Sequence, residues 1–152
     1  MQNYYLCYKS ELSSTTDESE IINILGASQK NNLRKNITGM LLYINNHFIQ
    51  LIEGERDDVN SLYKKIVTDS RHFGARILSE GVADKRFFPN WIMGFRAMNT
   101  QDLKEMAEMN GLTELSIDGL LSESNPHFAI ELLKSFYKNG ELDFYKFWKE
   151  EV

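Results

Sequence analysis

Apolar and polar residues alternate in five short runs within the first hundred positions, and each run predicts a strand. The runs cover residues 4–9, 37–44, 47–53, 75–82 and 91–95. Period two places Tyr8 on one face of the first strand and Gln50 on one face of the third. Asn45 and Asn46, which tolerate positive φ, predict a tight turn between the second and third strands. The polar residues 10–16 predict a loop after the first strand.

Two stretches between these strands repeat apolar residues at helical spacing. In the first stretch, Asp17 fits an N-cap with Glu20 three residues later, and the helix is expected to end near residues 31–32. In the second stretch, Asp57 or Asp58 is the predicted N-cap. The apolar side of this second helix consists of Val59, Leu62, Tyr63 and Ile66.

The order strand, helix, strand, strand, helix, strand indicates an α+β fold of the ferredoxin-like βαββαβ type, with both helices on one face of the sheet. A fifth strand is added, and helical stretches at residues 101–109 and 126–137 precede an aromatic end. We expect these C-terminal helices to cover the other face of the sheet, to form an interface, or both. The predicted domains are residues 1–97 and a helical extension over residues 98–152, with no effector domain after it.

Composition narrows the class of protein. A chain of 152 residues that is 42% hydrophobic has the size of one domain with a buried core. The net charge of -5 and the scattered basic residues argue against a nucleic-acid partner. No apolar run approaches the roughly 18 residues of a membrane span, and no signal peptide is evident, so we expect a cytoplasmic protein without a membrane partner. The single cysteine, Cys7, excludes an intrachain disulfide, and no metal site is predicted.

Gln50 is the residue that this pattern explains least. A side-chain amide buried without partners costs roughly 1 to 3 kcal/mol, so a glutamine inside an apolar strand should have a hydrogen-bonding counterpart. The usual catalytic motifs offer none: the sequence has no Gly-rich phosphate loop, no nucleophile elbow and no histidine pair at metal-binding spacing.

Polar groups at the edges of the helices provide a candidate counterpart. Ser28 and Asn32 are four residues apart on the first helix, and Lys65 and Asp69 are spaced in the same way on the second. Taken singly, each is an ordinary helix-end, surface or core residue. If both helices lie on the face of the sheet that carries Gln50, a slot opens between them that suits a flat ring with polar edges.

Six segments of the sequence carry a resemblance to a known family. They are LCYKS (6–10), SQKNN (28–32), ITGMLLY (37–43), FIQLIEGE (48–55), DSRH (69–72) and RFFPNWIMGF (86–95). Together they resemble the BLUF family, the flavin-binding sensors of blue light, with family-like spacing over residues 4–95. The resemblance implies a short, single-domain photoreceptor that binds FAD noncovalently.

The resemblance also implies roles for individual residues. Tyr8 corresponds to the photoactive tyrosine, and Gln50 to the glutamine between that tyrosine and the flavin. Trp91 and Met93 correspond to the residues of the fifth strand that compete for a place near the glutamine. Ser28 corresponds to a serine that engages this strand or its tryptophan.

The same resemblance implies a set of cofactor-binding residues. They are Tyr8, Ser28, Asn31, Asn32, Gln50, Lys65, Asp69, Arg71 and His72. Among them, Asn32 is expected to bond the carbonyl edge of the ring, and Arg71 and His72 to lie near the cofactor tail. Lys65 departs from a close relative type that has arginine there; a lysine offers charge to a phosphate but no planar, bidentate fork.

We therefore predict a photoreceptor in which light drives proton-coupled electron transfer from Tyr8 and rearrangement of Gln50. The signal is expected to pass through the strand with Trp91 and Met93 and the C-terminal helices to an unidentified partner protein. We expect a homo-oligomer and no enzymatic output. The rivals are a flavin-dependent oxidoreductase active in the dark and an interaction module without cofactor. An acylphosphatase fits less well, because no Gly-rich anion loop follows the first strand.

Overall fold

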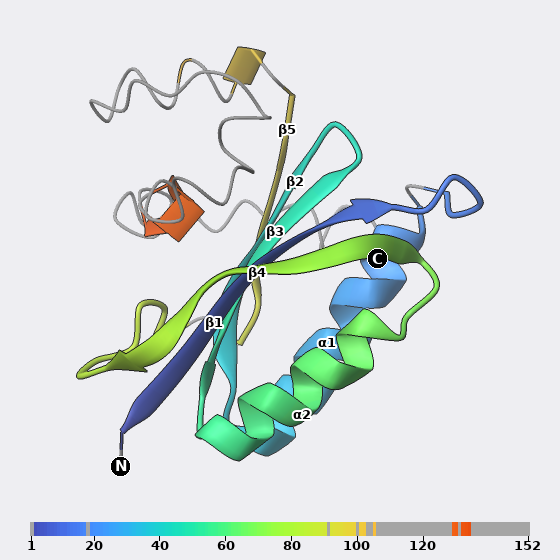
Figure 1. Ribbon diagram of the computed structural model, residues 1–152. Coiled ribbons are helices and arrows are strands. Elements are labelled where there is room, and N and C mark those ends of the chain that lie inside the picture. The colour runs from blue at the N-terminus through green and yellow to red at the C-terminus, as the bar shows by residue number, and fades with distance from the viewer. Residues whose placement is uncertain are drawn as a thin grey trace.

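A mixed five-stranded sheet in the order β4-β1-β3-β2-β5 forms the centre of the computed structural model (Figure 1). Its strands are β1 (Asn3–Leu12), β2 (Thr38–Ile44), β3 (His47–Gly54), β4 (His72–Ala83) and β5 (Gly94–Met98). β1 pairs antiparallel with β3 and β4, whereas β2 pairs antiparallel with β3 and parallel with β5. The register sets Tyr8 of β1 directly opposite Gln50 of β3 in the middle of the sheet.

Two helices, α1 (Glu20–Lys35) and α2 (Arg56–Val67), cover the same face of this sheet (Figure 1). The structure describes residues 2–17, 19–90, 92–99, 101–102, 105, 129–130 and 132–134. The predicted ferredoxin-like α+β fold with an added fifth strand is confirmed. Asn45 and Asn46 both have positive φ, at 44° and 69°, so the predicted tight turn between β2 and β3 is confirmed as well.

The first strand and the first helix are longer than the sequence predicts. Residues 10–12 belong to β1 and not to a loop, because β3 and β4 pair with this end of the strand on both sides. α1 continues beyond residues 31–32 to Lys35. It ends there because Asn36 adopts the left-handed conformation, and its backbone N–H bonds to the carbonyls of Asn32 and Leu33.

Both predicted N-caps are wrong, by two residues for α1 and by two or three for α2. Ser19 is the N-cap of α1, and Asp17 instead accepts a hydrogen bond from the Ser19 backbone N–H. Glu55 is the N-cap of α2, and its side chain accepts from the backbone N–H of Asp57. The aspartates therefore lie in the first turn of α2, where the helix dipole favours a negative charge.

The fifth strand begins at Gly94, later than predicted, so Met93 lies immediately before β5 and not within it. Trp91 lies outside the described residues. Residues 101, 102 and 105 are helical, as are residues 129–130 and 132–134; the rest of the two predicted C-terminal helices and the aromatic end lie outside the described residues. The division of the chain after residue 97 stays a prediction.

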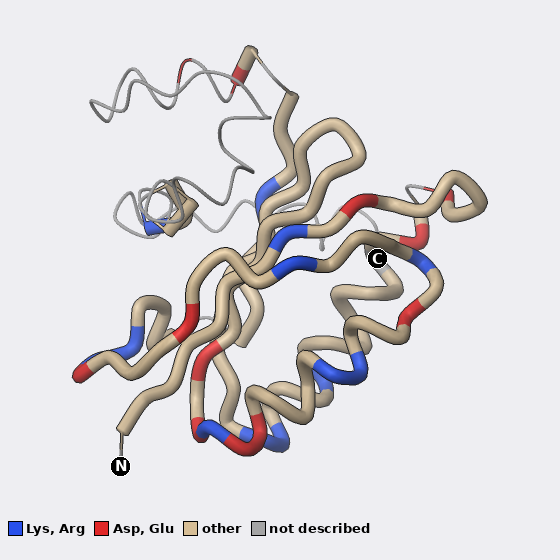
Figure 2. The backbone as a smooth tube through the Cα atoms, in the orientation of Figure 1, with Lys and Arg blue, Asp and Glu red and all other residues tan. Residues whose placement is uncertain are grey.

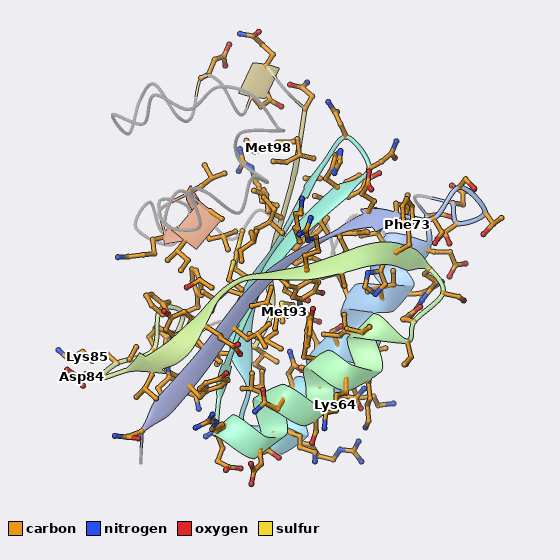
Figure 3. All side chains as sticks on the ribbon, viewed as in Figure 1. Lys64, Phe73, Asp84, Lys85, Met93 and Met98 are labelled. Atoms are coloured by element: carbon orange, nitrogen blue, oxygen red, sulfur yellow. The ribbon has the colours of Figure 1, made fainter. Side chains whose placement is uncertain are left out.

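The sheet separates two buried apolar clusters. The cluster under the helices includes Met93, whereas the cluster on the opposite face includes Met98 and the C-terminal residues Ala129, Ile130, Leu132 and Leu133 (Figure 3). Cys7 belongs to the opposite-face cluster and is fully buried there. Burial raises the pKa of its thiol to about 12.

Candidate functional site

A pocket lies between α1, α2 and the sheet, at the place where the sequence predicts a slot. It encloses about 780 Å³ of empty space, counting the part open to solvent. Eight of the nine predicted cofactor-binding residues line it: Tyr8, Ser28, Asn31, Gln50, Lys65, Asp69, Arg71 and His72. Asn32 does not; it lines a smaller neighbouring hollow together with Asn31 and Lys65.

A chain of hydrogen bonds runs along the floor of the pocket. The Tyr8 hydroxyl donates to Oε1 of Gln50, and Nε2 of Gln50 donates to Sδ of Met93 at 3.2 Å. All three side chains are at least 94% buried. Gln50 therefore has a phenol at its acceptor end and a thioether, a weak acceptor, at its donor end.

Burial keeps the Tyr8 phenol neutral. Desolvation raises its pKa far above the ordinary value, and the neighbouring Tyr63, Cys7 and Asp69 act in the same direction. The Tyr63 ring lies 5.4 Å from the Tyr8 ring, centroid to centroid, and shields it on the α2 side. The proton on Tyr8 Oη is thus held and directed at Gln50.

An ion pair lies at the end of the pocket beyond α2. Arg71 Nε donates to Oδ1 of Asp69 at 2.9 Å, and this bond to Arg71 is the largest of the effects that hold the pKa of Asp69 below its usual range. Asp69 follows the end of α2, so the predicted sharing of one helix side with Lys65 is wrong, although both residues line the pocket. His72 Nε2 is bonded to the carbonyl of Ile66.

The segment before β5 is tied to α1 by two side-chain amides. Asn32 Nδ2 donates to the Ile92 carbonyl at 3.1 Å, and Gln29 Nε2 donates to the Met93 carbonyl at 3.4 Å. These two bonds hold the segment against α1; the role expected of Ser28 toward this strand or Trp91 stays a prediction, because Trp91 lies outside the described residues. Sequence reasoning missed Gln29, since a glutamine on a helix next to polar residues gives no signal of its own.

Three buried polar atoms in or beside the pocket have no hydrogen-bond partner among the described residues: Ser10 Oγ, His72 Nδ1 and Asn32 Oδ1. Such atoms are rare in folded proteins, and a bound ligand is one way in which their bonding is completed. Ser10 was missed as a site residue because it was assigned to a loop; strand periodicity from Tyr8 was the signal that could have found it. The flavin ring has a flat apolar body with N–H and carbonyl groups along one edge, so these residues fit a flavin.

The charged residues do not favour a different kind of site. Both signs of charge occur on α2, with Asp57 and Asp58 in its first turn and Lys64 and Lys65 in its last, and on β4, which carries Arg76 and Glu80 (Figure 2). Within the same residues, no three His, Cys, Asp or Glu side chains are grouped to hold a metal ion. None of the described helices combines the length and the apolar character that a membrane crossing requires.

The fold and the pocket define a ferredoxin-like domain that holds a flat, polar-edged ring between two helices and a sheet. Residues 4–94 match the family described as BLUF, sensors of blue-light using FAD. The match extends over more than half of the sequence, and the chain belongs to the BLUF family, whose members bind flavin.

Known relatives include proteins much longer than this chain. The blue light- and temperature-regulated antirepressor BluF of Escherichia coli K12 is 29% identical over 83 residues, which are 54% of this chain and 21% of that protein. The photoactivated adenylate cyclase subunit beta of Euglena gracilis is 29% identical over 85 residues, 56% of this chain and 10% of that protein. The chain thus spans about a fifth of the first relative and a tenth of the second.

Solved structures of similar length also match. The dark-state structure of BlrB, a BLUF protein, has a TM-score of 0.73 and 30% identity, covering 91% of this chain and 97% of that one. BlsA in its photo-activated state has a TM-score of 0.73 and 28% identity, covering 87% and 94%. The whole fold described here, not only the pocket, is therefore that of this family.

Proposed function

We propose that this chain is a blue-light photoreceptor that binds FAD in the pocket between α1 and α2 and has no enzymatic output of its own. The observation that carries the proposal is the chain of bonds from Tyr8 through Gln50 to Met93, which joins the floor of the pocket to the segment before β5. FAD is favoured because Lys65 and Arg71 place positive charge at the pocket for the phosphates of a dinucleotide.

Residues from both helices and from the end of the pocket would hold the cofactor. Ser28 and Asn31 approach from α1, Lys65 from α2, and Arg71 and His72 from the end of the pocket beyond α2. Buried acceptor oxygens such as Asn32 Oδ1, beside the pocket, suit a ring N–H. When bound, the flavin supplies absorption of blue light and, once excited, acts as the oxidant.

Tyr8 is the donor of an electron and a proton in this proposal. A neutral phenol whose hydroxyl already points at Gln50 Oε1 has a path for the proton into the amide. Gln50 then rotates or tautomerises, which exchanges its donor and acceptor ends. Nε2 no longer donates to Met93 Sδ, and the contact between the pocket and the segment with Trp91 and Met93 changes.

The signal would leave through this segment and the C-terminal helices toward a partner protein, in a homo-oligomer. A light-dependent change at an interface requires that the two switch states differ in their contacts there. The relatives support an output through attached or associated proteins, since one is an antirepressor and another a cyclase subunit. We further propose a cytoplasmic location, which the lack of paired cysteines supports.

The visible absorption spectrum of the purified protein, before and after a blue pulse and through dark recovery, tests this function. Wild type should show a flavin spectrum that shifts slightly to the red and returns without bleaching. Gln50→Leu should load flavin and lose the shift, because leucine neither accepts from Tyr8 nor donates to Met93. Gln2→Leu is the matched control, since the same change at an exposed residue outside the pocket and the Met93 segment should leave the shift in place.

Three other outcomes would contradict this proposal, each in a different way. A red shift that persists in Gln50→Leu with normal loading would make the assignment of the switch wrong. A bleached flavin together with oxidation of reduced nicotinamide in darkness would identify an oxidoreductase. A protein that takes up no flavin would be a binding module.

A further inference from the structure

Glu53 is a charged residue buried completely inside the sheet. It lies near the end of β3, with 0% of its surface exposed. Glutamate is almost never fully buried unless its carboxylate is well bonded, because desolvation of a charge is costly. The proposed pocket chemistry makes no use of it: Gln50 faces the pocket, whereas Glu53, three residues later on a strand, faces the other side of the sheet.

Four donors surround the Glu53 carboxylate. Oε1 accepts from the Asn3 side chain at 3.1 Å and from the Phe87 backbone N–H at 2.8 Å. Oε2 accepts from the Thr38 hydroxyl at 3.0 Å and from the Phe88 backbone N–H at 2.7 Å. Two of the four donors are thus consecutive backbone groups of the segment between β4 and β5.

A second set of hydrogen bonds holds the same segment between β4 and β5 in place. Arg86 donates to the Thr38 hydroxyl at 3.0 Å and to the Asn36 carbonyl at 2.8 Å. Thr38 therefore links the guanidinium to the Glu53 carboxylate. Hydrogen bonds that involve a charged group are roughly twice as strong as neutral ones, so this cluster fixes Phe87 and Phe88 against the end of β3.

The residues held in this way contact the C-terminal helical residues. The Phe88 side chain is fully buried in the cluster that contains Ala129, Ile130, Leu132 and Leu133. The Phe87 ring packs against the same cluster, and the Lys134 ammonium lies 5.8 Å above that ring. The position of Phe87 and Phe88 consequently sets the surface on which these C-terminal residues rest.

The segment from Phe88 to Met93 is attached to β3 at both ends, by side chains on opposite faces of the strand. Glu53 holds the Phe88 end on the C-terminal side of the sheet, and Gln50 holds the Met93 end on the pocket side. If only the Gln50 bond changes, the end at Glu53 stays fixed. A change at Met93 then distorts the segment relative to its fixed Phe88 end, and the segment does not move as a whole.

We propose that Glu53 is the positioning residue of the switch: it holds Phe87 and Phe88 on β3 and thereby couples the pocket to the packing of residues 129–134. The holding of Phe87 and Phe88 is independent of flavin. The coupling rests on the proposed function. The two parts are therefore tested by different measurements on the same variants.

Amide hydrogen exchange in the dark tests the holding. In Glu53→Gln, an amide –NH₂ replaces one of the two acceptor oxygens and faces donors, so at least one of the backbone amides of Phe87 and Phe88 should exchange at least tenfold faster than in wild type. Amides of β1 and β3 that exchange only on global unfolding serve as the internal reference. Asn3→Ala is the matched control, because it removes one donor from the carboxylate but neither backbone bond; its Phe87 and Phe88 rates, relative to that reference, should match wild type.

Equal exchange at Phe87 and Phe88 in Glu53→Gln and wild type would overturn the holding role. Should Glu53→Gln not fold, Glu53→Asp replaces it. This variant keeps the charge but is one methylene too short to reach both amides, so at least one of the two should exchange tenfold faster. Unchanged rates for both amides in Glu53→Asp would equally overturn the proposal.

Light tests the coupling in the flavin-loaded protein. Wild type and Asn3→Ala should show both the red shift and a light-dependent change in exchange over residues 129–134. Glu53→Gln should keep the red shift, because the pocket face is intact, and lose the change over residues 129–134. A light-dependent change that persists there would overturn the coupling. Absence of a red shift in wild type would instead count against the proposed function and would leave the dark exchange result valid.

Discussion

At the scale of single residues, burial and hydrogen bonding set the protonation states of Tyr8 and Asp69 in the pocket. The phenol of Tyr8 is kept protonated mainly by burial, whereas the carboxylate of Asp69 is kept ionised mainly by its hydrogen bonds to Arg71. The two shifts have opposite directions because a buried group avoids charge, and a group beside a cation favours the anion. The pocket thus combines a neutral floor with an ionised end.

The Asp69–Arg71 pair predicts a specific acid dependence. Since the folded-state pKa of Asp69 is lowered, its contribution to the free energy of unfolding is present above the ordinary carboxyl pKa and is lost as pH falls through the folded-state pKa. In Arg71→Gln, the pKa of Asp69 should rise toward its ordinary value, and this acid-sensitive contribution, about 1 kcal/mol or less for a partly exposed pair, should disappear.

Carboxyl titration by NMR measures this shift directly. Lys65→Gln is the control, because it removes a pocket cation that is not bonded to Asp69, and it should leave the carboxyl titration close to that of wild type. An unchanged Asp69 titration in Arg71→Gln would show that Arg71 is not the cause of the lowered pKa.

At the scale of elements, close approach of β2 and β3 depends on one glycine. A Cβ added at Gly39 would overlap the carbonyl oxygen of Leu51 on the neighbouring strand. At Gly81 of β4, an added Cβ would lie 3.5 Å from the Tyr5 hydroxyl oxygen, which is an ordinary contact. Gly39 and Gly81 therefore differ in the space that an added Cβ would have.

Gly39→Ala should therefore lower the free energy of unfolding by more than about 2 kcal/mol, because backbone must move to make room. Gly81→Ala should change it by less than about 1 kcal/mol, since a strand alanine also reduces the freedom of the unfolded chain. Urea denaturation of both variants measures the difference. Similar losses in the two would mean that the strands can separate at Gly39 without cost.

Periodicity was sufficient to predict the elements and their order, but not their ends. The end of β1 depends on pairing with β3 and β4, which no local pattern contains. The end of α1 depends on Asn36 adopting a left-handed conformation, and the sequence had several asparagines that could have done so. Contacts between distant segments decide both ends.

The sequence predicted most residues of the candidate site, but not all of them. Gln50 was conspicuous because a lone amide in an apolar strand needs a partner, and the structure provides Tyr8 and Met93. Gln29 and Glu53 were not predicted as functional residues. The first sits on a mixed helix face, and the partners of the second come from residues 3, 38, 87 and 88, far apart in the sequence.

At the scale of the whole molecule, the two faces of the sheet carry different parts of the structure. Both helices cover one face (Figure 1), where the pocket lies, and the other face carries the cluster that includes the C-terminal helical residues. Because Leu132 is fully buried in the second cluster, the packing there contributes to the stability of the sheet that bears the pocket.

Leu132→Ala should lower the free energy of unfolding by about 2 to 5 kcal/mol, the usual cost of truncating a buried leucine. Leu33→Ala is the same chemical change at a leucine of α1 that is 67% exposed, and it should cost less than about 0.5 kcal/mol. Far-ultraviolet circular dichroism and the absorbance of bound flavin should report one common unfolding transition. Two separate transitions would show that the C-terminal residues unfold independently of the pocket.

The burial of Cys7 has a consequence for chemical labelling. It is the only cysteine in the sequence, it is fully buried, and its thiol has a pKa of about 12. Thiol reagents attack the thiolate, so at neutral pH the folded protein offers them no target. A cysteine introduced at an exposed position such as Lys64 on α2 (Figure 3) would be the single point of attachment for a fluorophore or spin label. The native sequence is therefore already suited to site-specific labelling, with no thiol to remove first.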